Sequence, residues 1–321
     1  MMLAASLVVC LSCIEPARAS GGPAWPGRHS FQEPLRKGPG PGSEHASGPT
    51  VAELYLSTLR DVLTGSALQT PSLVAGAGAL LKQLPFQDRV RHRGEHWCAY
   101  CYTLVGTARL TTVWQLLERT IAEGVPGDFV EAGVWKGGNS IFARAVQRVL
   151  GEGARRRTYV CDSFAGVPRA STSLDDDDHS EFQYLSVPLE KVRDHFERFQ
   201  MLDGNVVFVK GLFSESLPRL RHELGAEGRR IAVLYGDGDL FESFYDILCN
   251  LYEFVAVGGY FFCDDCRILH SAMRAVLRFR RENGISEDLV SLESSYGGVY
   301  WRKEQDVRVN YSRYRVWNSS R

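Results

Sequence analysis

The sequence predicts an α/β fold: a mostly parallel seven-stranded sheet wrapped by helices, with an antiparallel hairpin at its C-terminal end. Short apolar runs between residues 127 and 305 alternate with segments whose apolar residues recur at helical spacing. This alternation is typical of a parallel sheet with crossover helices. The last two apolar runs are separated only by a turn around Gly297 and Gly298, so they are expected to pair as an antiparallel hairpin.

The expected strands are apolar runs that end close to a glycine or a polar side chain. They cover residues 129–134, 157–163, 205–211, 231–237, 258–265, 289–295 and 298–303. Helical segments separate the first five, at residues 140–150, 189–200, 214–224 and 240–254. Connections of this length allow the first five strands to run parallel.

The segment ahead of the sheet is expected to be helical. Residues 51–65 and 101–124 carry apolar side chains at helical spacing, and the second run ends on Gly124. The sequence therefore predicts an N-terminal helical cap over residues 51–126, followed by the sheet domain over residues 127–305.

The two ends of the chain differ from this globular part. In residues 1–19 an apolar stretch is followed by Ala17-Arg18-Ala19, a pattern like a signal-peptidase site, although the usual basic start is absent. A targeting peptide would direct the protein to the secretory pathway or an organelle, whereas a plain leader would leave it in the cytoplasm. Residues 20–50 are rich in Gly, Pro and Ser and are expected to be a disordered linker, and residues 306–321 form a C-terminal tail.

Charge and hydropathy argue against two classes of partner. The chain has 37 basic and 38 acidic side chains, and no basic stripe suggests a nucleic acid. After the N-terminus, no apolar stretch reaches the roughly 20 residues that a membrane helix needs. We therefore expect a chain without stable membrane insertion; a homo-oligomer is compatible with the sequence.

The cysteines are interpreted as buried thiols. Cys161, Cys263 and Cys266 lie in or beside apolar strand-like runs, where a thiol behaves as a small hydrophobic group. Cys98 and Cys101 form WCAYC, which is similar to a thioredoxin motif. That motif normally follows a strand and opens a helix, whereas this one lies in a stretch that looks helical, so a redox role is not favoured.

Ligands of open parallel sheets bind beyond the carboxyl ends of the strands. The first strand ends in EAGVWKGGNS, where Glu131, Gly133, Gly137 and Gly138 lead into a helix. Glycines there allow the backbone to approach a ligand, although a plain strand-to-helix turn also fits. Asp162 ends the second strand, where it can accept hydrogen bonds from ribose hydroxyls or cap a turn.

Acidic side chains end the fourth and fifth strands. Asp237 follows the fourth strand, and Asp264 and Asp265 follow the fifth. Adjacent parallel strands deliver their ends to one rim, so these carboxylates should face one another, and Mg²⁺ prefers such oxygen ligands. Asp239 lies two residues further on, where both a general base and an acidic group at a helix start fit.

Together these motifs resemble the macrocin-O-methyltransferase family, class I S-adenosylmethionine enzymes that methylate sugar hydroxyls of antibiotics. The resemblance spans residues 97–304 and implies a Rossmann-like class I methyltransferase fold. It is carried, in chain order, by GDFVEAGVWKGGNS, DSFAGVP, FVKGLFSESLP, DGDLFES, GGYFFCDD and GVYWRK.

The resemblance also implies roles for individual residues. It assigns Mg²⁺ to three carboxylates, Asp237, Asp264 and Asp265, and the general base to Asp239. The Gly-rich turn that begins at Glu131 and the side chain of Asp162 would hold the methionine and ribose parts of S-adenosylmethionine. Phe213 would lie near its adenine.

The implied function is Mg²⁺-assisted O-methylation of a small-molecule hydroxyl on a glycoside or another diol. Two alternatives remain open: a metal-dependent glycosyltransferase using DGD as its D-x-D motif, and an inactive cofactor-binding module on the same fold. Leu104 stands where the family has a Met, which leaves the acceptor undetermined. Residues 170–187 are expected near the acceptor, and their acidic run is interpreted as a solvated loop.

Overall fold

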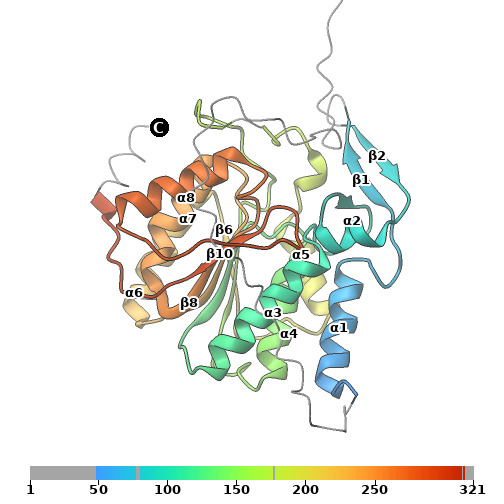
Figure 1. The fold of residues 1–321 in the computed structure, drawn as a ribbon, viewed down its shortest axis with the longest axis horizontal. Helices are drawn as coiled ribbons and strands as arrows, with labels where there is room; N and C mark the ends of the chain where they lie inside the picture. The colour runs from blue at the N-terminus through green and yellow to red at the C-terminus, as the bar shows by residue number, and fades with distance from the viewer. Residues whose placement is uncertain (1–47, 77–79, 176–177, 313, 315–321) are drawn as a thin grey trace, which may run out of the picture.

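The structure is a computed structural model that describes residues 48–312, except 77–79 and 176–177, together with Tyr314 (Figure 1). The predicted targeting peptide, almost all of the predicted linker and part of the predicted tail lie outside these residues. In the described part of the chain, no helix has both the length and the apolar character needed to cross a membrane.

A seven-stranded sheet forms the centre of the molecule, in the order β6-β5-β4-β7-β8-β10-β9. The five strands from β4 to β8 run parallel, and β10 pairs antiparallel with both β8 and β9. This confirms the predicted α/β class and the C-terminal hairpin. The strands are β4 Asp128–Ala132, β5 Thr158–Asp162, β6 Val206–Lys210, β7 Ile231–Gly236, β8 Val255–Cys263, β9 Val290–Ser291 and β10 Val299–Arg302.

The chain starts the sheet in its middle, at β4, and this order creates the binding position. From β4 it adds β5 and β6 on one side, then returns to place β7 on the other side. The carboxyl ends of β4 and β7 therefore flank a topological switch point. In open parallel sheets, ligands bind at this point.

Helices cover both faces of the sheet (Figure 1). Alternate strand residues face opposite ways, so Leu234 and Phe261 belong to the core under α6, α7 and α8, while Tyr235 and Phe262 belong to the core under α3 and α4. The main helices are α1 Val51–Leu63, α3 Thr107–Ala122, α4 Gly138–Val149, α5 Leu189–Arg198, α6 Phe213–Glu227, α7 Phe241–Leu251 and α8 His270–Glu282, with short 3₁₀ turns at Gln183–Leu185 and Tyr252–Phe254.

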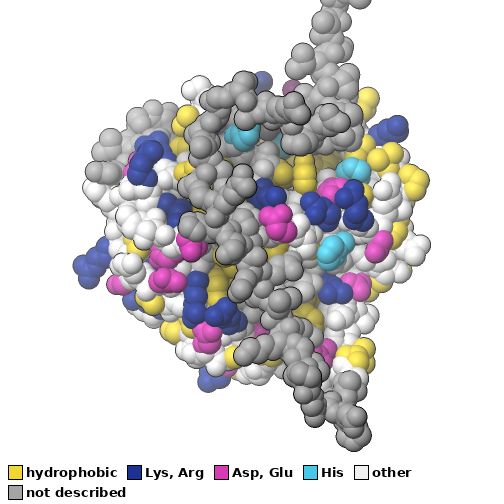
Figure 2. Space-filling model, viewed as in Figure 1, with side chains coloured by type: hydrophobic (Ala, Val, Ile, Leu, Met, Phe, Trp, Pro, Cys, Tyr) yellow, Lys and Arg dark blue, Asp and Glu magenta, His cyan; other side chains and the backbone are white. Residues whose placement is uncertain are grey.

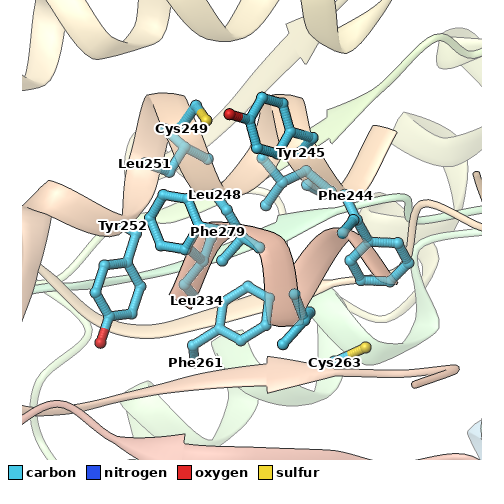
Figure 3. Packing of buried hydrophobic residues seen from close by; sticks show 14 of the residues in the cluster. Leu234, Phe244, Tyr245, Leu248, Cys249, Leu251, Tyr252, Phe261, Cys263 and Phe279 are labelled. Atoms are coloured by element: carbon cyan, nitrogen blue, oxygen red, sulfur yellow. The ribbon is translucent and has the colours of Figure 1, made fainter. Parts of the chain in front are cut away.

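The α7 and α8 face shows how the sequence pattern produces this packing (Figure 3). Phe244 and Leu248 lie one turn apart on α7, so both point at the sheet and meet Leu234 and Phe261. All four are fully buried. Truncating such a leucine to alanine costs about 2–5 kcal/mol, so this face anchors the start of α7 and the loop before it.

The segment before the sheet differs from the helical prediction. Helix α1 begins at Val51 as expected, because Thr50 and Glu53 form a reciprocal capping box. Residues 66–106, however, contain a three-stranded antiparallel sheet in the order β2-β1-β3. Its elements are β1 Ser72–Ala75, β2 Leu81–Leu84, β3 Trp97–Cys98 and the short helix α2 Asp88–Arg93. We call residues 51–126 the cap.

The structure also corrects the interpretation of the cysteines. Cys98 pairs with Cys101, and Cys263 pairs with Cys266, as disulfides; Cys161 and Cys249 are free and buried. Each pair lies where a strand ends and the chain turns, which brings the Cα atoms to 5.5 and 5.7 Å, within the range of a disulfide.

Charge is mixed over the described surface that Figure 2 displays, where basic and acidic side chains are interspersed. On this face, the described surface therefore shows no large patch of a single charge sign.

Candidate active site

A cavity of about 760 Å³ lies beyond the carboxyl ends of β4, β5, β7 and β8. Strand ends form its floor, the cap contributes Trp97 and Leu104, and the loop after β5 contributes His179 and Phe182. A cavity of this size, lined by both apolar and acidic side chains, suits a small-molecule ligand. Seven of the predicted site residues line it: Gly133, Asp162, Phe213, Asp237, Asp239, Asp264 and Asp265.

The Gly-rich turn, residues 133–138, needs its glycines for close packing. Gly133 has φ +94°, and a Cβ there would overlap the carbonyl oxygen of Asp237. Gly137 caps α4 with φ +83°, and a Cβ on Gly138 would overlap the carbonyl oxygen of Tyr102. Gly133 therefore brings β4 against the end of β7 and faces the cavity, while Gly137 and Gly138 fix the start of α4.

Glu131 lies beneath this turn and does not line the cavity. Its carboxyl group accepts hydrogen bonds from Asn139 Nδ2 at 3.0 Å and from the Ser140 hydroxyl. Burial raises the pKa of Glu131 to about 8, because burial disfavours the charged form more than these hydrogen bonds favour it. Glu131 thus ties the end of β4 to the first turn of α4.

Asp162 is half-buried at the end of β5 and lines the cavity. One carboxylate oxygen accepts from the Val134 amide at 2.8 Å, and the other from the Phe164 amide at 2.7 Å. Burial raises the pKa of Asp162, while these hydrogen bonds oppose the rise. The side chain therefore bridges two loops as a turn cap, and it accepts two longer hydrogen bonds, from the Ser163 hydroxyl at 3.3 Å and the Trp135 amide at 3.4 Å.

Phe213 begins α6 and lines the cavity beside Gly211 and Leu212. Gly211 has φ +138°, which lets the chain turn sharply from β6 into the helix. The half-buried ring of Phe213 also packs on the core under α6 and α7. Its position is set by that core and by this turn.

Three carboxylates form an acidic cluster: Asp237, Asp239 and Asp265. Oxygen atoms of the three lie within 4.8 Å of one another. Burial, and then the neighbouring carboxylates, raise the pKa of Asp237 and of Asp265 well above the ordinary value. The sheet topology forces this repulsion, because β7 and β8 are adjacent and parallel.

Asp264 lies in a different environment from its neighbour Asp265. Its carboxylate accepts hydrogen bonds from Arg109 Nη1 and from the Tyr235 hydroxyl, and all three side chains are buried. Burial disfavours the charge on Arg109, but the adjacent carboxylate outweighs this and the pKa of Arg109 is raised. The structure thus groups Asp239, and not the predicted Asp264, with Asp237 and Asp265.

Asp239 has an unusual backbone conformation, with φ 55°. A non-glycine residue rarely occupies this left-handed region unless its surroundings hold it there. The Ser271 hydroxyl donates to its carbonyl oxygen at 2.9 Å, and His179 Nδ1 lies 3.6 Å from its carboxylate. The carboxylate is thereby turned into the cavity, toward the acidic cluster.

Sequence reasoning missed the contributions of the loop after β5. Asp175, in the acidic run interpreted as a solvated loop, accepts a hydrogen bond from the Phe241 amide at 2.6 Å, at the start of α7. Only three-dimensional proximity links these residues, which lie 66 positions apart.

The cap and this loop also form an aromatic wall, Trp97 and Phe182, that sequence reasoning missed. Their ring centroids lie 5.2 Å apart at an interplanar angle of 88°. Both side chains line the cavity, although they lie on different segments of the chain from the Gly-rich turn. The sequence could have indicated this wall only through the presence of aromatic residues in the cap and in the loop after β5.

Comparisons with known proteins place the chain among O-methyltransferases. The model of the macrocin-O-methyltransferase (TylF) family matches residues 52–303. A tetracenomycin-C 4'-O-methyltransferase of Streptomyces olivaceus, which acts on a dimethoxy-rhamnosyl derivative according to its name, is 37% identical over 78% of this chain and 92% of its own. A demethyldecarbamoylnovobiocin O-methyltransferase of Streptomyces niveus is 34% identical over 78% and 94%.

A solved structure agrees with these matches. The structure of the O-methyltransferase NovP superimposes with a TM-score of 0.71 at 33% identity, over 79% of this chain and 100% of that one. The similarity therefore includes the cap as well as the sheet domain.

Proposed function

Since the chain belongs to the macrocin-O-methyltransferase family and is an S-adenosylmethionine-dependent O-methyltransferase, we propose that it methylates a hydroxyl of a sugar or related diol with the help of a divalent cation. One observation carries this proposal. The acidic cluster and the predicted cofactor-binding residues Gly133, Asp162 and Phe213 line the same cavity. Methyl donor and acceptor hydroxyl can therefore meet there.

The cofactor side of the cavity is assigned to the ends of β4, β5 and β6. The carboxylate of Asp162 is held by the Val134 and Phe164 amides, and the ribose hydroxyls would replace only its two longer hydrogen bonds, from Trp135 and Ser163. The ring of Phe213 offers a flat apolar surface to the adenine. Gly133 lets the methionine part approach the backbone, while Glu131, Gly137 and Gly138 hold the turn in shape from behind.

The donor set of the acidic cluster fits Mg²⁺. Mg²⁺ is commonly held by one or two carboxylates and retains several waters. We assign Asp237 and Asp265 to it, because these carboxyl groups repel each other and the nearby Arg109 is already paired with Asp264. When bound, such a cation lowers the pKa of a hydroxyl that it contacts. Asp264, neutralised by Arg109, holds the β8 end in place.

Asp239 is assigned as the proton acceptor. Its carboxylate faces the cavity within the acidic cluster, and its backbone is fixed in a strained conformation, which holds a base in one direction. Asp239 would accept the proton of the acceptor hydroxyl, while S-adenosylmethionine, when bound, would supply the methyl group.

The acceptor is assigned to the cap side of the cavity. The name of the Streptomyces olivaceus relative specifies a rhamnosyl group, and sugars pack their C–H faces on aromatic rings. Trp97 and Phe182 supply such rings in the cavity lining. We propose a glycoside or another vicinal diol as the acceptor.

Methyl transfer from labelled S-adenosylmethionine to panels of glycosides, catechols and aliphatic diols tests this proposal. We expect transfer to a subset of vicinal diols, and none to the same molecules with both hydroxyls already methylated. Transfer only to amines or thiols would contradict the assignment, and tight cofactor binding without any turnover would indicate an inactive module.

A further inference from the structure

A buried polar cluster in the cap stands outside the proposed reaction. Cys98 ends β3, Cys101 follows three residues later, and each is 2% exposed. Arg91 of α2 is also 2% exposed, and its Nη1 lies 2.6 Å from Cys98 Sγ and 2.9 Å from Cys101 Sγ. Thr70 Oγ1 lies 2.9 and 3.2 Å from the same two sulfurs. We call these four residues the Arg91 cluster.

The guanidinium of Arg91 has only neutral partners. It donates to the carbonyl oxygens of Thr64, at 2.5 Å, and Thr70, at 3.2 Å, and to the Ser72 hydroxyl at 3.3 Å. Its Nε has no hydrogen bond, and among the described residues it forms no ion pair with a carboxylate. A buried charge without a counter-charge is costly. Burial accordingly lowers the pKa of Arg91.

A thiolate would supply the missing counter-charge. We propose that Cys98 and Cys101 are a redox-active pair, in which Arg91 stabilises the thiolate that forms when their disulfide is reduced. A cationic neighbour favours the thiolate over the thiol, and a stabilised reduced form makes the disulfide easier to reduce. The hydroxyl of Thr70 is placed to donate to the same sulfurs.

The chemistry requires an external dithiol as reductant. The dithiol gives up two electrons and two protons and closes its own disulfide, while the bond between Cys98 Sγ and Cys101 Sγ breaks. One proton stays on one cysteine as a thiol. The other is released to solvent, because Arg91 keeps the second sulfur as a thiolate. Oxidation reverses each step.

The second disulfide serves as an internal reference. Cys263 and Cys266 have the same spacing, but they flank Asp264 and Asp265 and so lie beside carboxylates rather than beside an unpaired cation. The two pairs share spacing and burial, and among the described residues only Cys98 and Cys101 have an arginine within hydrogen-bonding distance of their sulfurs.

Other charged groups near the Arg91 cluster do not replace a counter-ion. Lys136 Nζ donates to the Cys101 carbonyl at 3.2 Å, and the Tyr184 hydroxyl donates to the Cys98 carbonyl. His96 and Glu95 belong to the segment before β3. Lys136 adds positive charge, and Glu95 is committed to Arg93 at 2.6 Å. These contacts also join the pair to the Gly-rich turn and to the loop after β5.

The test measures how readily each disulfide is reduced. The full chain is equilibrated with mixtures of reduced and oxidised dithiothreitol, quenched, alkylated under denaturing conditions, and each cysteine pair is scored by mass spectrometry. We expect an equilibrium constant for reduction at least about tenfold larger for Cys98–Cys101 than for Cys263–Cys266. Equal constants, or the reverse order, would overturn the proposal.

Arg91 variants separate its charge from its packing. Arg91→Met should lower the constant for Cys98–Cys101 by about tenfold and leave that of Cys263–Cys266 unchanged, while Arg91→Lys should keep most of the effect. If Arg91→Met fails to fold, a second measurement tests the proposal. It compares the ultraviolet absorbance of the thiolate in the reduced wild type with that of the Cys98→Ser/Cys101→Ser variant. A thiolate at neutral pH supports the proposal, and its appearance only above about pH 8.5, the ordinary range, refutes it.

Discussion

The acidic cluster and the Arg91 cluster treat charge in contrasting ways. Asp237 and Asp265 gather negative charge that Arg109, already paired with Asp264, offsets only in part, whereas Arg91 places positive charge among neutral groups. The pair of Arg109 and Asp264, by contrast, buries charges that cancel. A buried charge without a counter-charge is costly, so such a charge indicates a place where a ligand binds or an opposite charge forms. A buried ion pair such as Arg109 and Asp264 indicates a structural role instead.

The comparison predicts its largest effect at Asp239. Asp239→Asn removes the proton acceptor but keeps the shape of the acidic cluster, so turnover should fall about 10²- to 10⁴-fold while the affinities for Mg²⁺ and S-adenosylmethionine stay close to wild type. Single-turnover kinetics and calorimetry measure the two quantities. Recovery of turnover at high Mg²⁺ would show instead that Asp239 is a ligand of the cation.

Substitutions in the buried ion pair of Arg109 and Asp264 should lower the stability of the protein. Arg109→Met leaves the buried carboxylate of Asp264 unpaired and should cost about 3–5 kcal/mol of unfolding free energy. The double variant with Asp264→Asn should recover part of this loss. Urea denaturation measures both.

An exposed pair offers a matched control for this prediction. Arg119 and Glu123 lie at 2.8 Å, with side chains 51% and 36% exposed, so Arg119→Met should cost at most about 1 kcal/mol. A loss for Arg109→Met as small as that control would remove the pair from its supporting role.

The cofactor side should respond less strongly. Asp162→Ala should weaken S-adenosylmethionine binding by about 1.5–3 kcal/mol, the range for hydrogen bonds to a charged group. Calorimetric titration measures this, with circular dichroism to confirm folding, because Asp162 also caps two loops. Unchanged affinity in a folded variant would exclude Asp162 from the ribose site.

A substitution in the aromatic wall of Trp97 and Phe182 should change binding of the acceptor and leave binding of the cofactor unchanged. Trp97→Ala should raise the KM for the acceptor about five- to tenfold, which corresponds to the loss of one aromatic contact, and leave cofactor affinity unchanged. Tyr100→Ala is the matched control, since Tyr100 lies nearby in sequence but is 71% exposed and outside the cavity. Equal effects of the two substitutions on the KM would contradict the proposal that Trp97 contacts the acceptor.

Glu131 should act on stability and on its pH dependence, because burial favours the protonated form of its carboxyl group. The pKa of Glu131 is raised from 4.5 to about 8, so the folded state holds its proton more tightly than the unfolded state. The stability from this proton is complete below pH 4.5 and is lost as the pH rises through about 8. In Glu131→Gln, the free energy of unfolding in urea should differ less between pH 5 and pH 8 than it does in the wild type. An unchanged difference would contradict the raised pKa of Glu131.

The sheet and the position of its site could be predicted because both follow from local patterns. Alternating apolar runs and helical segments define the parallel strands, and parallel strands place Asp162, Asp237 and Asp265 at one edge. The resemblance to a family then supplied the chemistry that the pattern alone left open.

The rest depends on contacts distant in the sequence. Asp264 and Asp265 are neighbours with different environments, and only Arg109, 155 positions away, distinguishes them. The strands of the cap span four, four and two residues, too few for their periodicity to be recognised. The sulfurs looked apolar in sequence, and only the fold places Arg91 beside Cys98 and Cys101.

The most direct test of the account titrates Mg²⁺ into chelator-treated protein while methyl transfer is followed. The incompletely compensated carboxylates of Asp237 and Asp265 predict that the wild type is silent in chelator and recovers when Mg²⁺ is added, and that Asp237→Asn needs at least about tenfold more Mg²⁺ for half-maximal rate. Full turnover by the wild type in chelator would contradict the account. The acidic cluster would then owe its carboxylates to helix capping and loop structure alone.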